Sequence, residues 1–246
     1  MPNATSPSFP STDALAPVIH VVIPAAGIGA RSGARGPKQY AVVAGQPLVF
    51  HTVAAFLQAP ELARLCVVVA PEDGQCPLDD PRVEVVAVGG DSRAASVAAG
   101  LRHLLDTGAQ AQDWVMVHDA ARCLITPQDI QRLILACVAA DVGGLLALPL
   151  PDTLKQADAQ GRVGATLERA DKWLAQTPQM FKLGALAQAL AGDLRGVTDE
   201  ASAMERVGAA PLLVQGSAMN IKVTYPEDFA LAHAVLASRS PSKETS

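Results

Sequence analysis

The sequence predicts an α/β fold with a mostly parallel central sheet. Half of the 246 residues are apolar, and short apolar runs alternate with longer stretches of helical periodicity. Aromatic residues make up only 4% of the chain, with alanine and valine as the common apolar types, which suits helices packed closely on a sheet. This length supports a single domain, which we place at residues 18–237.

The expected elements follow in order along the chain. We expect strands at residues 18–23, 65–70, 83–88, 114–118, 144–148, 173–176 and 212–215. We expect helices at residues 47–58, 92–105, 127–140, 182–191 and 199–207. Thr126 followed by Pro127 is a capping signal for the third helix.

One segment, at about residues 149–175, breaks the alternation of strands and helices. It consists of two polar, roughly alternating runs on either side of a turn near residues 159–161. This pattern predicts a projecting β-hairpin arm. An isolated hairpin is only marginally stable, so the arm is expected to need a partner.

Both ends of the chain are expected to be disordered tails. Residues 1–17 are rich in Pro, Ser and Thr, and they have neither the basic start nor the apolar run of a secretory signal. Residues 238–246 are too polar to bury enough apolar area to become ordered.

Charge and cysteine usage argue against several classes of protein. The net charge is −5 without a basic run, which disfavours a nucleic-acid-binding surface. The four cysteines form no CxxC pair and no metal-ligand spacing with the five histidines, which fits a reducing cytoplasm. No stretch approaches the roughly 18 consecutive apolar residues of a membrane span.

The loop after the first strand has the composition of a triphosphate cradle. Small residues let backbone N–H groups approach an anion, and fixed positive charges neutralise it. The small residues are Ala25, Ala26, Gly27 and Gly29, and the cations are Arg31, Arg35 and Lys38. This pattern indicates nucleotidyl or phosphoryl transfer.

The spacing of residues in this loop excludes two other kinds of phosphate-binding loop. A Walker A loop requires Ser or Thr after its lysine, whereas Gln39 follows Lys38. A dinucleotide fingerprint places its third glycine one position before Gly33, and no acidic residue follows at the ribose-binding distance. A plain glycine turn after a strand remains the other interpretation.

Asp119 is the clearest acidic candidate for a metal site. It directly follows a predicted strand, and ligands of open α/β sheets bind at the carboxyl ends of strands. A carboxylate there is suited to Mg²⁺, which bridges phosphate oxygens, although a turn-capping role is the alternative. His118 is expected to face the other side of the strand as a structural residue.

Seven motifs occur together in one order. They are PAAGIGARSGARGPKQY (24–40), GGDSR (89–93), VHDAAR (117–122), DTLK (152–155), TPQMF (177–181), TDEAS (198–202) and NIKVT (220–224). Over residues 18–236 the chain thereby resembles the 2-C-methyl-D-erythritol 4-phosphate cytidylyltransferases. The resemblance implies a Rossmann-like nucleotidyltransferase domain, a Mg²⁺-dependent reaction of CTP with the polyol phosphate in isoprenoid synthesis, a cytoplasmic location and a homodimer embraced by the arm.

The resemblance also implies roles for individual residues. The catalytic cations are Arg31, Lys38 and Lys222, and the metal ligand is Asp119. The CTP site comprises Ala25, Ala26, Gly27, Gly29, Gly90, Asp91 and Ser96. The polyol phosphate site comprises Arg122, Asp152, Thr153, Arg169 and Thr177, with Arg169 reaching the neighbouring subunit's substrate. From the residues alone, Lys222 also fits a surface lysine, and Ser96 fits a hydroxyl bonded to the backbone.

The chain departs from the family pattern at two positions. Cys123 stands where the family usually has proline, and Ala30 precedes Arg31 in place of an arginine pair. Transfer to another polyol phosphate, such as ribitol 5-phosphate, and a non-catalytic nucleotide-binding regulator are the rival functions nearest to this one. A thiol hydrolase is opposed by spacing, because the adjacent His118 and Asp119 diverge on a strand.

Overall fold

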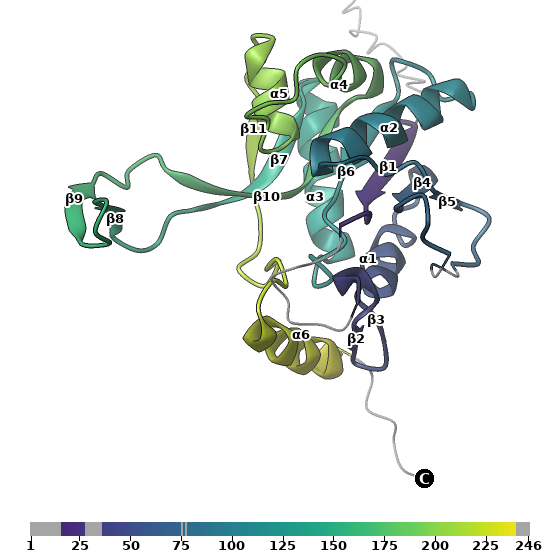
Figure 1. Cartoon of the computed structure of the whole chain (residues 1–246). Coiled ribbons are helices and arrows are strands. Elements are labelled where there is room, and N and C mark those ends of the chain that lie inside the picture. The colour runs from purple at the N-terminus through teal and green to yellow at the C-terminus, as the bar shows by residue number, and fades with distance from the viewer. Residues whose placement is uncertain (1–15, 28–35, 75, 77, 240–246) are drawn as a thin grey trace, which may run out of the picture.

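A seven-stranded sheet forms the centre of the protein (Figure 1). The structure is a computed structural model that describes residues 16–27, 36–74, 76 and 78–239. Its central strands are β1 (Ile19–Pro24), β4 (Leu62–Val68), β5 (Val83–Val86), β6 (Trp114–Val117), β7 (Gly144–Pro149), β10 (Trp173–Lys182) and β11 (Leu212–Gln215). Their spatial order is β11-β7-β10-β6-β1-β4-β5.

The sheet is mostly parallel, as predicted. Strand β1 lies parallel to β4 and β6, β4 lies parallel to β5, and β11 lies parallel to β7. Only β10 runs antiparallel to its neighbours β6 and β7. The carboxyl ends of β1, β4, β5 and β6 therefore meet at one edge of the sheet, where ligands of such folds bind.

Helices cover both faces of the sheet (Figure 1). They are α1 (Leu48–Phe56), α2 (Arg93–Asp106), α3 (Pro127–Ala140), α4 (Leu183–Ala189), α5 (Glu200–Arg206) and α6 (Pro226–Arg239). Val21 and its alternate neighbours on β1 pack with α1 and α3, whereas Val22 packs with α2 and with residues of α4 and α5. Alternate side chains of a strand point to opposite faces, so a strand buried on both faces is apolar throughout.

Most of the predicted elements are confirmed. The helix at 127–140 and the strand at 212–215 have the predicted bounds. Thr126 caps α3 as expected, because its side chain accepts a hydrogen bond from the backbone N–H of Asp129 at 3.2 Å. Other bounds differ from the prediction by a few residues.

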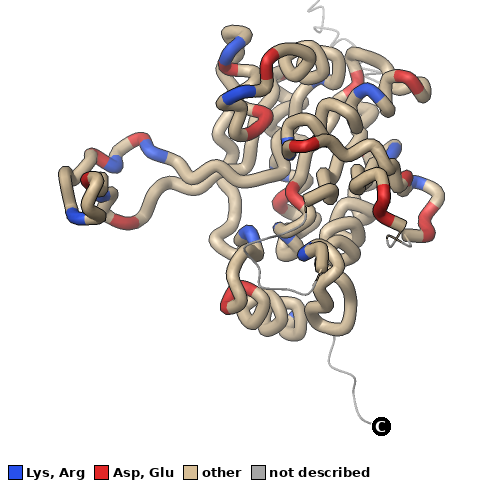
Figure 2. Tube along the Cα trace, in the orientation of Figure 1, with Lys and Arg blue, Asp and Glu red and all other residues tan. Residues whose placement is uncertain are grey.

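The projecting arm is confirmed as a feature of the fold (Figure 1). Strands β8 (Leu154–Ala157) and β9 (Val163–Leu167) pair antiparallel with each other and belong to no other sheet. The turn between them contains Gly161, whose φ of +76° favours glycine. Basic and acidic residues are interspersed along the arm (Figure 2).

Three parts of the chain differ from the predictions. Strand β10 continues to Lys182, well past residue 176, because residues 179–182 pair with β6, and Met180 and Phe181 are buried in the two core clusters. A short unpredicted hairpin joins β2 (Val42–Val43) to β3 (Gln46–Pro47). Helix α6 was also missed, and it includes Ser238 and Arg239, so the expected tail at 238–246 was placed two residues too early. The remaining tail predictions concern residues 1–15 and 240–246, which lie outside the described residues.

Helix α6 has start signals that a sequence analysis can use. Pro226 opens the helix, and Glu227 and Asp228 lie in its first turn. The Asp228 carboxylate accepts hydrogen bonds from the backbone N–H groups of Thr224 and Tyr225. Only Ala232 of α6 is fully buried, and Phe229, Val235 and Leu236 pack partly buried against the same cluster. Among the helices of the described ranges, none combines the length and apolar character needed to cross a bilayer.

Candidate active site

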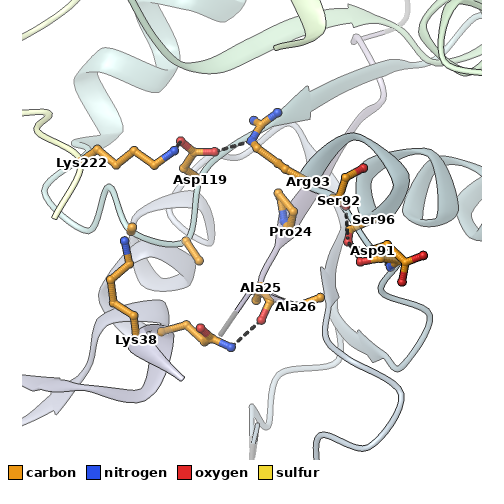
Figure 3. A pocket seen from close by; sticks show the side chains of 15 residues that line it. Pro24, Ala25, Ala26, Lys38, Asp91, Ser92, Arg93, Ser96, Asp119 and Lys222 are labelled. Carbon is orange, nitrogen blue, oxygen red and sulfur yellow. Dashed lines mark hydrogen bonds and ion pairs between the residues drawn. The ribbon is translucent and has the colours of Figure 1, made fainter. Parts of the chain in front are cut away.

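A cavity of about 460 Å³ lies at the carboxyl ends of the parallel strands (Figure 3). Its wall is formed by the segments that follow β1, β5 and β6, by the start of α2 and by one residue of the NIKVT segment. The lining residues are Pro24, Ala25, Ala26, Gly27, Lys38, Gln39, Gly90, Asp91, Ser92, Arg93, Ser96, Asp119, Ala120, Ala121 and Lys222. Four of the seven motifs, which are far apart in the chain, thus line a single cavity together with Ser96 near the start of α2.

The predicted cradle lies on this wall as far as the structure describes it. Ala25, Ala26 and Gly27 line the cavity, whereas Gly29, Arg31 and the other residues of 28–35 lie outside the described residues. The start of the loop is held in place by the backbone N–H of Ala25, which donates to the Val68 carbonyl at 2.7 Å. Buried Gln39 donates its side-chain amide to the Ala25 carbonyl at 2.5 Å and so joins the PKQ segment to the same point.

The GGDSR segment forms the part of the cavity wall beside the cradle. A Cβ atom on Gly89 would lie 2.7 Å from the Val69 carbonyl oxygen, so this position requires glycine. The Ser96 hydroxyl accepts from the Gly90 N–H at 3.1 Å and donates to the Ser92 carbonyl at 3.0 Å. Ser96 therefore shapes the Gly90–Asp91 turn through backbone bonds, which was the alternative considered from the sequence.

Two lysines reach the cavity from different parts of the chain (Figure 3). Lys38 begins the 3₁₀ helix η1 (Lys38–Tyr40), and its Nζ donates to the Val223 carbonyl at 2.7 Å. Lys222 precedes Val223, whose N–H donates to the Ala121 carbonyl at 2.9 Å. These bonds hold both ammonium groups beside the loop that carries Asp119.

Asp119 is surrounded by cations. Its Oδ1 accepts from Arg93 Nε at 2.7 Å, and its Oδ2 lies 2.8 Å from Lys222 Nζ and 3.8 Å from Arg122 Nε. Burial alone would raise the pKa of this carboxyl, but Arg93 and Lys222 hold the pKa well below its usual value. Asp119 is therefore a permanent anion that orients the cations on the cavity wall.

His118 directly follows β6, is fully buried and does not line the cavity, which fits the structural role expected of it. Its Nδ1 is 3.0 Å from the Thr177 hydroxyl, and its Nε2 is 3.2 Å from the Arg122 carbonyl. The Thr177 hydroxyl also accepts from the Asp119 N–H at 3.0 Å. These contacts are all satisfied if Thr177 donates to Nδ1 and a neutral imidazole donates from Nε2. Thr177 is buried, and its hydroxyl orients the backbone at Asp119.

This arrangement predicts how stability depends on pH. Complete burial lowers the pKa of His118 from 6.5 to about 3, so between these values the unfolded chain binds a proton that the folded protein rejects. We expect the free energy of unfolding to fall, as pH decreases through this window, by up to about 1.4 kcal/mol per pH unit. Urea denaturation of the wild type and His118→Asn at pH 7 and pH 5 measures this. An equal pH dependence in both proteins would contradict the assignment.

Arg122 lies behind the cavity wall. Its Nη1 donates to the Asn220 carbonyl at 2.6 Å, and buried Asn220 donates its side-chain amide to the Thr177 carbonyl at 2.8 Å. Arg122 thus joins the Asp119 loop to the segment that carries Lys222. Cys123, which replaces the usual proline, is buried in a cluster with Leu124 and Val223 that packs the same two segments together.

The predicted polyol phosphate residues of the arm do not reach this cavity. Asp152, Thr153 and Arg169 are exposed, and none of them lines it. Arg169 instead borders a second hollow of about 440 Å³ at the base of the arm, together with Lys172 and Trp173. The chain therefore separates its predicted acceptor-binding residues into two groups, Arg122 and Thr177 beside the cavity and the other three on the arm.

The described residues offer no ready-made metal cage. No group of three or more His, Cys, Asp or Glu side chains within them is arranged to hold an ion. Asp119 is the one carboxylate besides Asp91 on the cavity wall, and its oxygens already contact Arg93 and Lys222. This donor set fits only an ion that takes most of its ligands from phosphate oxygens and water.

Four residues that support the site were not predicted from the sequence. They are Gln39, Arg93, Glu200 and Asn220, all of which belong to the seven motifs. Arg93 and Glu200 form a bidentate ion pair across 107 positions of the chain. The local sequence gives only weak signals for this pair. Arg93 follows a serine in GGDSR, and Glu200 follows the helix cap in TDEAS, and neither position by itself indicates an ion pair.

Comparison with known proteins decides the family. The sequence pattern of the family described as "IspD: 2-C-methyl-D-erythritol 4-phosphate cytidylyltransferase" matches residues 19–238. The chain belongs to this family. Among IspD relatives, the 2-C-methyl-D-erythritol 4-phosphate cytidylyltransferase of Chromobacterium violaceum is 51% identical over 222 residues, which cover 89% of this chain and 97% of that protein.

A bifunctional relative and a solved structure are also similar to this chain. The "Bifunctional enzyme IspD/IspF" of Albidiferax ferrireducens is 58% identical over 240 residues, and the match covers 96% of this chain but only 57% of that protein. The crystal structure of a 4-diphosphocytidyl-2C-methyl-D-erythritol synthase superposes with a TM-score of 0.79 at 39% identity, covering 89% of this chain and 98% of that one. The nucleotidyltransferase fold expected from the sequence is confirmed by this likeness.

Proposed function

We propose that this protein joins CTP to 2-C-methyl-D-erythritol 4-phosphate, giving 4-diphosphocytidyl-2-C-methyl-D-erythritol and pyrophosphate in isoprenoid precursor synthesis. The observation that carries the proposal is the convergence of Lys38, Lys222 and Asp119 on one cavity in a chain of the IspD family. A phosphate oxygen of the acceptor attacks the α-phosphorus of CTP. The bond from that phosphorus to the bridging oxygen of the β-phosphate breaks, and pyrophosphate leaves with the electron pair.

The cavity wall suits this reaction because charge, rather than a protein nucleophile, is what phosphoryl-type transfer requires. Lys38 and Lys222 come from two segments far apart in the sequence and offer two ammonium groups to a polyphosphate. Preorganised cations stabilise the charge that builds on the phosphorus oxygens in the transition state. The Gly90–Asp91 turn and the Ala25–Gly27 strand end provide close backbone approach for the nucleotide.

Magnesium is part of the proposal. When bound, Mg²⁺ would neutralise the triphosphate and the leaving pyrophosphate. Asp119 would contribute the protein oxygen, and the nucleotide and water would supply the remaining ligands. Arg93 and Lys222 hold the pKa of Asp119 well below its usual value and so keep the carboxylate ionised, as a metal ligand must be.

A homodimer is also proposed. The arm extends away from the chain's own cavity, and its strands pair only with each other (Figure 1). Trp173 and Leu174 at its base and Val163 near its tip are exposed apolar residues that a partner would cover. If a second copy received the arm, Arg169 would reach the acceptor phosphate bound by that copy. A guanidinium is well suited to bind a phosphate.

A pyrophosphate-release assay tests the activity. Purified protein with Mg²⁺ and CTP is compared with methylerythritol phosphate, with ribitol 5-phosphate and without an acceptor. Release only with methylerythritol phosphate supports the proposal. Release with ribitol 5-phosphate would retain the reaction type and replace the acceptor, whereas CTP binding without release under any condition would favour a nucleotide-binding regulator. Omission of Mg²⁺ in a parallel reaction is expected to abolish release.

A further inference from the structure

Glu200 is a buried carboxylate for which the proposed reaction has no direct use. It is the first residue of α5, is 1% exposed and does not line the cavity. The start of α5 is fixed on both sides of this residue. Gln179 of β10 accepts from the Ala201 N–H at 2.8 Å and donates to the Asp199 carboxylate at 2.8 Å.

Glu200 grips Arg93 with both carboxylate oxygens. Arg93 Nη1 lies 2.6 Å from Oε1, and Nη2 lies 3.1 Å from Oε2. This geometry leaves Nε of the same guanidinium facing Asp119 Oδ1 at 2.7 Å (Figure 3). Because the guanidinium is planar and rigid, its orientation at Glu200 determines its orientation at Asp119.

The contacts form a row of alternating charges that ends at the cavity. Glu200 binds Arg93, Arg93 binds Asp119, and Asp119 Oδ2 lies 2.8 Å from Lys222 Nζ. The Glu200 end is buried, whereas the side chain of Lys222 is 43% exposed and faces the cavity. The row therefore connects the fixed start of α5 to the long, flexible side chain of Lys222 in the cavity.

We propose that Glu200 is a positioning residue, which through Arg93 holds the Asp119 carboxylate and with it the Lys222 ammonium in the geometry for transfer. This inference rests on the proposed function. Glu200 also neutralises Arg93 and keeps this third cation of the wall from turning into the cavity toward the triphosphate. A purely stabilising role explains the pair less well, because a buried ion pair is on average no more stable than well-packed apolar residues of similar volume.

Single substitutions provide the first test. Glu200→Gln is expected to lower kcat by about 10- to 100-fold, because a shift of about 1 Å in the groups that hold the reactants has an effect of this size. The KM for CTP is expected to stay within about threefold, because Glu200 contacts no substrate. Asp129→Asn is the matched control. Asp129 is also a buried acid near a helix start, paired with Arg132, but it lies outside the cavity. This variant is expected to lose stability and retain kcat.

A double variant separates positioning from stability. Arg93→Met alone leaves Glu200 buried without its partner, so its urea midpoint is expected to fall most, and adding Glu200→Gln should restore part of that loss. The kcat of the double variant is expected to equal that of Arg93→Met. Recovery of kcat together with the midpoint would overturn the proposal, as would a double variant in which the two losses of kcat multiply.

A readout without turnover keeps this inference distinct from the proposed function. Acetylation of Lys222 by acetic anhydride is followed by mass spectrometry, with Lys182 of the same molecule as the internal reference. Glu200→Gln is expected to raise the Lys222 rate relative to Lys182, because Asp119 is then no longer held against it. An unchanged ratio would overturn the positioning role. If the wild type releases no pyrophosphate and Glu200→Gln still raises the Lys222 rate relative to Lys182, the proposed reaction alone is refuted.

Discussion

Lys38→Ala is expected to lower kcat by about 10²- to 10³-fold, the usual effect of removing one preorganised group that stabilises a transition state. The Lys38 ammonium lies on the cavity wall, held by the Val223 carbonyl at 2.7 Å. Its removal leaves the buried core unchanged, so the fold should be retained. Steady-state pyrophosphate release and circular dichroism of the same preparations measure the two quantities.

Lys182→Ala is the matched control for this prediction. Lys182 is also held in one place, 3.3 Å from the Asp141 carboxylate and 3.8 Å from the centre of the Trp114 ring, but it lies outside the cavity. Its loss should alter stability slightly and leave kcat near the wild-type value. A Lys38→Ala protein with near-normal kcat would remove Lys38 from the catalytic group.

Arg169→Ala is expected to raise the KM for the polyol phosphate by about 10- to 100-fold while sparing CTP binding, as loss of a charge-assisted phosphate contact does. The reason is the position of Arg169 on the arm, away from the cavity that would hold CTP. Kinetics with each substrate varied in turn, together with CTP titration calorimetry, provide the comparison. Arg162→Ala at the turn of the arm is the control, and equal losses for both substrates would move Arg169 out of the acceptor site.

Mixed dimers extend this prediction to the assembly. If the arm acts on the neighbouring subunit, a dimer of one Lys38→Ala chain and one Arg169→Ala chain contains one site with both defects and one site with neither. Such tagged and purified mixed dimers should regain about half of the wild-type turnover, although each parent is nearly inactive at low acceptor concentration. If Arg169 serves its own subunit, every site carries one defect and no activity returns.

The elements predicted well are those with strong local signals. Helix α3 has a Thr126 cap, Pro127 at its first position and buried residues at helical spacing, and its predicted bounds are confirmed. Strand β11 and the buried strands β1, β4 and β6 are short apolar runs of the kind that parallel sheets require. The hairpin at β2 and β3 has two-residue strands, too short for any periodicity, and α6 has only one fully buried residue.

The candidate site was predicted in part for the same reason. Asp119, Lys38 and Lys222 belong to motifs whose residue types already indicate phosphate chemistry, and the fold brings them to one cavity. The family resemblance assigned Thr177 to the substrate site, and only the folded chain shows that its hydroxyl lies between the Asp119 N–H and His118. The arm residues were predicted to act on a partner, and that prediction remains to be tested by the mixed dimers.

What this sequence determines by itself is the class of fold, the alternation of its elements and the chemical type of its loops, because burial, capping and turn preferences act between residues a few positions apart. Only the tertiary structure decides that Arg93 stands between Asp119 and Glu200, because these partners are 26 and 107 positions away and are brought together by the packing of α2 and α5 on one face of the sheet. A guanidinium can donate to any carboxylate within reach, and the folded backbone determines which carboxylate that is.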